Sequence, residues 1–133
     1  MTWRSPDAED RRVAALWGVC AGLVVLFRPV WLAGAKVLPH CLWRTWTGWP
    51  CPGCGTTRAM TSLLHGELAH ALAFNPLAAL AGMTFLAGGL AAPLWLAAGG
   101  QAVSLSARPR PLAMAALAAL FLANWAWLYA SGV

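Results

Sequence analysis

The sequence predicts an all-α membrane protein with three transmembrane helices and an interfacial or re-entrant loop-helix between the first and second. Composition is the first reason: 60% of the 133 residues are hydrophobic and 10% are charged, whereas charged residues make up about a quarter of a soluble domain. The second reason is that residues 71–107 and 112–133 contain no charged side chain. A spanning helix needs about 20 predominantly apolar residues, so each of these stretches can hold one.

The two C-terminal spans are predicted near residues 76–98 and 112–131. Asn75-Pro76 suits the start of the first, because proline is tolerated in the first turn of a helix. Gly99-Gly100 are natural helix breakers at its end, and Pro93 is a candidate kink inside it.

The N-terminal span is predicted near residues 13–35. Its apolar core ends at Phe27 and is short, and Arg28-Pro29 interrupts it. A tilted helix whose Arg28 reaches the headgroups would complete the length. The alternative is a signal peptide cleaved after Ala35, but the apolar core lies farther from that position than such signals usually allow. We therefore expect a retained helix.

This reading gives a polar tail over residues 1–12 and one membrane domain over residues 13–133. The side that would hold the tail and the Arg108-Pro109-Arg110 loop carries five basic residues, and the opposite side carries four. The positive-inside rule then favours a cytoplasmic N-terminus in the cell membrane. The nine cationic residues are dispersed, so we expect no nucleic-acid partner. The expected partners are the lipid bilayer and either another membrane protein or a second copy of this chain.

Residues 36–70 hold the predicted loop and amphipathic helix. Trp43, Trp46 and Trp49 recur at three-residue spacing, and indole rings favour the headgroup layer. Thr56 or Thr57 is expected to cap the helix that follows. That helix would carry apolar residues on one side, with Gly66 weakening its middle: Met60, Leu63, Leu64 and Leu68.

The segment Cys51-Pro52-Gly53-Cys54-Gly55 is the stretch most suggestive of chemistry, and we call it the thiol turn. It lies just ahead of a predicted helix N-terminus, with Arg58 one turn into that helix. The helix dipole and the guanidinium would both lower the pKa of the thiols. Disulfide exchange and metal binding both require the thiolate.

Four interpretations of the thiol turn remain open. As a zinc knuckle it supplies two of the four ligands that zinc requires; Cys41 and His40 are candidates for the others, and His65 or His70 could serve but not both. A structural disulfide, a redox pair and a turn kept only for its shape are the alternatives. A c-type haem is excluded at its usual motif because Gly55 stands where histidine is needed. Cys20, inside the first span, is expected to be a small buried hydrophobe.

Two asparagines have polar side chains that need partners near or inside the spans. Asn75 is expected to cap the second span, or to reach back to Arg58 or the thiol turn; both arrangements can hold together. Asn124 lies inside the last span, where an interhelical hydrogen bond would satisfy it.

Three separated elements resemble a family of small bacterial multi-pass membrane proteins that is catalogued as a domain of unknown function. They are a Cys-Pro-x-Cys-Gly-x-Thr-Arg turn, a Leu-x-x-Gly-(Asp/Glu) element and an Asn-Pro-Leu helix start, and the match covers about residues 40–80. Cys41 resembles an additional upstream cysteine of many members. The resemblance implies a membrane location but no activity. It also implies importance for six residues: Cys51, Cys54, Thr57, Arg58, Asn75 and Pro76.

The sequence favours a small accessory or assembly protein whose thiol turn is structural. The alternative is a thiol-based metal-binding or redox module at the membrane surface, with zinc as the candidate cofactor. We do not expect an enzyme, since no acid–base pair or complete nucleophile constellation is evident.

Overall fold

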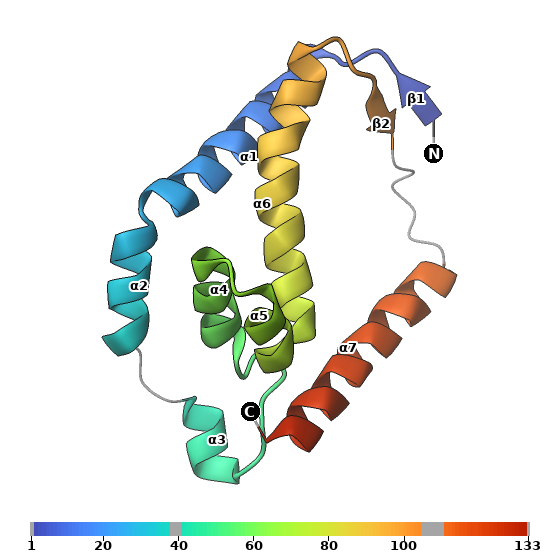
Figure 1. Ribbon diagram of the computed structural model, residues 1–133. Coiled ribbons are helices and arrows are strands. Elements are labelled where there is room, and N and C mark those ends of the chain that lie inside the picture. The colour runs from blue at the N-terminus through green and yellow to red at the C-terminus, as the bar shows by residue number, and fades with distance from the viewer. Residues whose placement is uncertain (1, 38–40, 105–110, 133) are drawn as a thin grey trace.

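A computed structural model describes residues 2–37, 41–104 and 111–132 (Figure 1). These residues form seven helices and one pair of short strands, which confirms the predicted all-helical membrane architecture. The helices are α1 (Ala8–Leu26), α2 (Arg28–Val37), α3 (Leu42–Thr47), α4 (Thr56–His65), α5 (Leu68–Phe74), α6 (Pro76–Ala97) and α7 (Pro111–Ser131). The strands are β1 (Thr2–Arg4) and β2 (Ala102–Ser104).

Two helices, α6 and α7, are each long and apolar enough to cross a membrane. They have 22 and 21 residues and mean hydropathies of 1.7 and 1.6. Asn75 accepts a hydrogen bond from the Ala78 backbone N–H at 3.0 Å and Pro76 occupies the first turn, so α6 begins with the cap that the sequence predicts. Few residues of either helix are buried, 17% and 11% of their most apolar windows, as expected for helices that face lipid.

The N-terminal span differs from the single tilted helix predicted for residues 13–35. The structure has two helices there, α1 and α2. Ala8–Leu26 and the Arg28–Ala35 part of α2 meet at 62°. They make a third span only if this bent pair counts as one. Pro29 follows the bend, and it has no N–H to continue the hydrogen-bond ladder of α1. In addition, α1 starts inside the predicted polar tail, because Asp7 and Asp10 form a reciprocal capping box.

Small residues let α1 and α6 approach closely. A Cβ atom added to Gly88 would lie 2.5 Å from the Trp17 ring, and one added to Gly89 would lie 2.6 Å from the Cβ of Ala21. Close backbone approach at glycine is typical of helix pairs in membranes. The same packing explains why the prediction for Cys20 was wrong: Cys20 is exposed, because α1 turns Ala14 and Ala21 inward instead.

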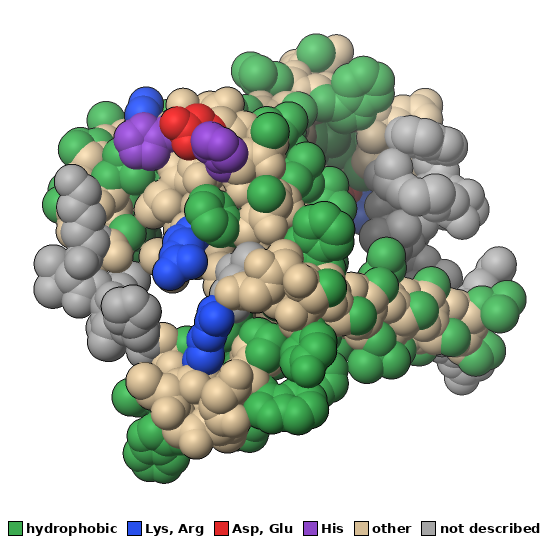
Figure 2. Space-filling view, turned by 60° about the horizontal axis from the view of Figure 1, so that its bottom comes forward, with side chains coloured by type: hydrophobic (Ala, Val, Ile, Leu, Met, Phe, Trp, Pro, Cys, Tyr) green, Lys and Arg blue, Asp and Glu red, His purple; other side chains and the backbone are tan. Residues whose placement is uncertain are grey.

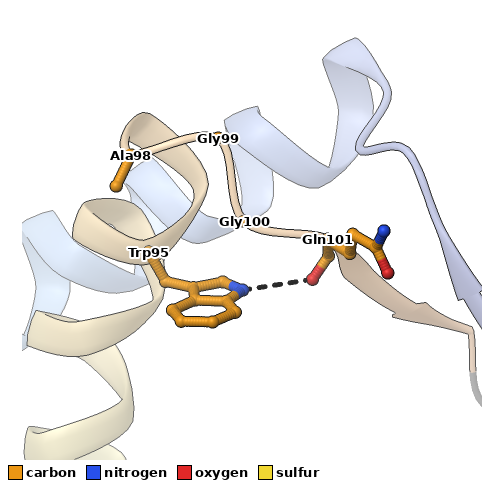
Figure 3. Close-up of a pocket in the computed structure, with 5 residues that line it drawn as sticks. All are labelled: Trp95, Ala98, Gly99, Gly100 and Gln101. Carbon is orange, nitrogen blue, oxygen red and sulfur yellow. Dashed lines mark hydrogen bonds between the residues drawn. The ribbon is translucent and has the colours of Figure 1, made fainter.

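The N-terminal tail lies beside the segment that follows α6, which the sequence did not predict. Thr2 pairs with Ser104 and Arg4 with Ala102 in an antiparallel ladder. The turn between α6 and β2 passes through Gly99 at φ +83°. There the Trp95 indole N–H donates to the Gln101 carbonyl at 3.2 Å (Figure 3).

The segment α3–α5 lies toward the opposite end of α6 from these strands (Figure 1). The predicted amphipathic helix is interrupted: α4 ends at His65, its C-cap Gly66 has a φ of +83°, and α5 begins at Leu68. A left-handed residue stops a helix, and glycine adopts that conformation at little cost. The predicted threonine cap was also wrong, because Gly55 is the N-cap residue of α4 and no side chain caps it.

Candidate metal centre

Three cysteines meet between α3 and α4. The Sγ atoms of Cys41, Cys51 and Cys54 all lie within 4.8 Å of one another. The Cys41–Cys51 distance is 3.4 Å and the Cys51–Cys54 distance is 3.3 Å. All three are free thiols. We call this group the cysteine cluster.

The thiol turn is built by local backbone hydrogen bonds. The Cys54 N–H donates to the Cys51 carbonyl at 2.9 Å, and the Cys51 N–H donates to the Cys54 Sγ at 3.2 Å. Gly55 then adopts φ +76°, which favours glycine. The turn therefore points both sulfur atoms to one side and directs a backbone donor at one of them.

Cys41 approaches from the other side of the cluster, immediately before α3. Its carbonyl accepts from the Thr45 N–H at 3.1 Å, so the first turn of α3 fixes this residue. The helix ends at Gly48, with φ +73°, and the chain returns to Cys51. A short helix and a glycine turn thus bring together thiols ten residues apart.

The thiols have pKa values shifted in opposite directions. The Arg44 backbone N–H, followed by the Cys51 side chain, holds the pKa of Cys41 below its ordinary value. Burial, followed by the hydrogen bonds with Cys54 and Cys41, raises the pKa of Cys51 to about 11. The expectation that the α4 dipole and Arg58 would lower the pKa was therefore wrong for Cys51, because burial and the two neighbouring thiols raise it.

Asn75 connects the thiol turn to α6. Its side chain is 2% exposed, and its Nδ2 donates to the Cys54 carbonyl at 3.0 Å while its Oδ1 caps α6 at Ala78. Asn75 therefore both caps α6 and reaches back to the thiol turn, the two arrangements that the sequence suggested.

The last helix supports the same turn, a feature that sequence reasoning missed. The Trp125 indole N–H donates to the Pro50 carbonyl at 2.9 Å, one residue before the thiol turn. Its neighbour Asn124 accepts from the Leu77 N–H at 3.0 Å, which is the interhelical bond expected for that residue. The sequence did contain a signal for this contact. Asn124 and Trp125 are adjacent polar groups in an apolar span, and both need hydrogen-bond partners.

The remaining predicted ligands do not join the cluster where the structure describes them. His65 Nδ1 lies 3.4 Å from Arg28 Nη2, and His70 Nδ1 lies 3.2 Å from a Glu67 carboxylate oxygen. Among the described residues, the metal-ligating group around the thiol turn consists of the three cysteines. His40 lies outside the described residues.

The predicted supporting residues lie in α4 and at the start of α6. The Arg58 guanidinium lies 5.8 Å from the centre of the Phe74 ring, a cation–π arrangement. Thr57 lines a cavity together with Arg58 and Leu32. Pro76 starts α6 directly after Asn75.

The cysteine cluster has the chemistry and spacing of a site for a thiophilic metal ion. Tetrahedral zinc holds its sulfur ligands at about 2.3 Å, which places neighbouring sulfurs about 3.8 Å apart. The observed Sγ distances lie around that value. Thiolate ligands favour Zn²⁺, Cu⁺ and iron–sulfur clusters over hard cations.

The comparisons with known proteins cover the same part of the chain. Residues 41–89 match the family model described as "Protein of unknown function (DUF2752)". No curated protein and no solved structure matches. The matched segment begins at Cys41 and includes the whole thiol turn and the start of α6, so this chain is similar to that family where its cysteine cluster lies.

Proposed function

We propose that this integral membrane protein binds a thiophilic metal ion, with zinc the first candidate, through Cys41, Cys51 and Cys54. The observation that carries the proposal is the mutual approach of three Sγ atoms within 4.8 Å. A disulfide would use two thiols and leave the third beside it. A metal ion would use all three.

The polar contacts around the cluster support this function. The backbone N–H of Cys51 points at the Cys54 sulfur, and such donors stabilise negative charge on sulfur. Asn75 and Trp125 fix the turn from α6 and α7, so the donors are held before an ion arrives. Metal ligands supported by an outer shell of hydrogen bonds bind more tightly.

The raised pKa of Cys51 argues against a redox pair in which Cys51 attacks. An attacking thiol must be deprotonated, and its pKa is best near the ambient pH. With a pKa of about 11, Cys51 holds its proton at neutral pH. A cation at the cluster would displace that proton.

Metal content of the purified full-length chain tests the proposal. We expect about one zinc ion per chain by elemental analysis in the wild type, and a loss of most of it in Cys41→Ser and Cys51→Ser, because each substitution removes a ligand. Cys20→Ser is the matched control, since Cys20 is outside the cluster. A His40→Ala variant shows whether histidine supplies a fourth ligand.

The pH dependence gives a second readout. Because Cys51 must lose a proton to bind, zinc affinity should fall as the pH is lowered. In the metal-free chain the sign is the reverse: the raised pKa of Cys51 contributes stability that is present below its ordinary value of 9.0 and lost as the pH rises through about 11. The proposal would be overturned by membranes in which the chain holds no metal and Cys51 and Cys54 form a disulfide. It would also be overturned by a chain whose thiols are all free but which takes up no metal.

The second candidate is an accessory or assembly function through α7. Ala115, Ala119 and Ala123 recur at four-residue spacing and are exposed, and stripes of small residues are typical of helix–helix contacts in membranes. Cross-linking of single-cysteine variants along α7 in native membranes tests this candidate. Formation of a defined product would support a partner helix or a second copy of this chain.

A further inference from the structure

An apolar cavity of about 760 Å³ lies between the bent N-terminal pair and α4. Helices α1, α2, α4 and α6 all contribute to its wall. The lining is almost entirely hydrophobic, with Val24, Trp31, Met60, Leu64, Phe85 and Leu86 as its larger members. Its volume is within the range of about 300–1,000 Å³ that is typical of ligand sites.

A second, smaller cavity of about 380 Å³ adjoins it between α2 and α4. Its lining includes Leu32 and Ala35 and five residues with polar side chains: Arg58, His65, Thr57, Thr61 and Ser62. Three residues line both cavities: Ala35, Thr57 and Thr61. The two cavities therefore share a wall, and the smaller one adds an arginine and a histidine, Arg58 and His65, to the lining.

Neither Arg28 nor Arg58 forms an ion pair with a carboxylate in the described part of the chain. The carboxylates that form ion pairs among the described residues are those of Asp7 and Asp10, with Arg4, and of Glu67, with His70. Arg28 instead lies beside His65 at 3.4 Å, and His65 lines the smaller cavity. Figure 2 shows an acidic side chain between two histidines, with a cationic side chain beside them and further cationic side chains lower on the same face.

We propose that the two cavities together bind an anionic phospholipid, with its phosphate at Arg58 and His65 and an acyl chain in the apolar cavity. Arginine and hydroxyl groups donate hydrogen bonds to phosphate oxygens, and basic pockets between membrane helices suit lipid headgroups. The adjoining apolar cavity favours a lipid over free phosphate, because a small anion would leave that cavity without an occupant.

Lipid binding to the purified full-length chain tests the headgroup contact. We expect native mass spectrometry and thermal shift to show preferential binding of phosphatidylglycerol over phosphatidylcholine. Arg58→Gln should weaken phosphatidylglycerol binding about tenfold or more, because it removes a charged hydrogen-bond donor. Arg12→Gln is the matched control, since Arg12 is exposed and lines neither cavity.

A second pair of variants tests the acyl-chain contact without removing a charge. Gly34 lines the apolar cavity, and a Cβ there would meet nothing within 4 Å, so Gly34→Leu should fill the cavity and displace the lipid while α2 stays folded. Gly22→Leu is the control: its Cβ is equally unobstructed, but Gly22 does not line the cavity.

Three results would overturn the proposal. The first is binding of phosphatidylcholine as tight as that of phosphatidylglycerol. The second is thermal stabilisation by inorganic phosphate as large as that by phosphatidylglycerol. The third is unchanged lipid binding in Gly34→Leu. The cysteine variants need not affect lipid binding, so this inference and the metal proposal can fail separately.

Discussion

At the residue scale, one buried side chain holds the thiol turn against the membrane helices. Asn75 uses both ends of its amide: Nδ2 donates to the Cys54 carbonyl, and Oδ1 accepts from the Ala78 N–H. No other side chain with described surroundings bonds both to the thiol turn and to α6. The amide is nearly inaccessible to water, so the loss of either bond would leave a backbone group without a partner.

We therefore expect Asn75→Ala to destabilise the loop and the start of α6 by about 1–3 kcal/mol. Thermal unfolding in detergent and faster alkylation of Cys54, which is 5% exposed, would measure the effect. Asn124→Ala is the comparison, because it removes one interhelical bond without touching the turn. Unchanged alkylation of Cys54 in Asn75→Ala would contradict this role.

At the element scale, the contact between α1 and α6 depends on glycine. Gly88 and Gly89 receive the Trp17 ring and Ala21, and Gly18 on the opposite helix leaves room for Pro93. Hydrophobic periodicity alone could not identify this face, because α6 and the part of α1 that begins at Val13 are apolar on all sides. The small residues, rather than the large ones, determine where the helices touch.

Gly88→Leu should consequently push α1 away from α6. Overpacking of a close contact costs about 1–3 kcal/mol, and the Trp17 ring stands where the new side chain would go. A lower unfolding temperature and a change in Trp17 fluorescence would measure it. Gly22→Leu should be nearly neutral, because space is open there; equal destabilisation by both would rule out a specific contact.

At the scale of the whole molecule, the cysteine cluster and the N-terminal tail lie toward opposite ends of α6 (Figure 1). The ladder between β1 and β2 keeps the tail beside the segment that follows α6. The distribution of basic residues favours a cytoplasmic tail, which would place the cluster on the outer side of the membrane.

A membrane-impermeant thiol reagent should then label the cluster from outside intact cells, after metal removal or reduction. The experiment uses a Cys20→Ser background, so that the three cluster cysteines are the remaining thiols of the chain. A Ser5→Cys reporter with the cluster cysteines replaced should be labelled only in inverted vesicles. The reverse pattern would establish the opposite orientation.

The sequence alone determined the membrane character, the two C-terminal helices, the cap at Asn75 and the pairing of Cys51 with Cys54 in one turn. Each of these depends on composition or on residues a few positions apart, where chain geometry leaves few alternatives. The sequence showed that Arg28-Pro29 interrupts the N-terminal span, but it did not give the angle between the two helices that meet there.

Only the tertiary structure decided which distant groups meet. It brought Cys41 to the thiol turn and Trp125 to Pro50, and it exposed Cys20. It also placed a cationic cavity beside an apolar one. These outcomes depend on how helices far apart in the chain pack against one another, and apolar membrane helices carry little sequence periodicity that could specify their contacting faces.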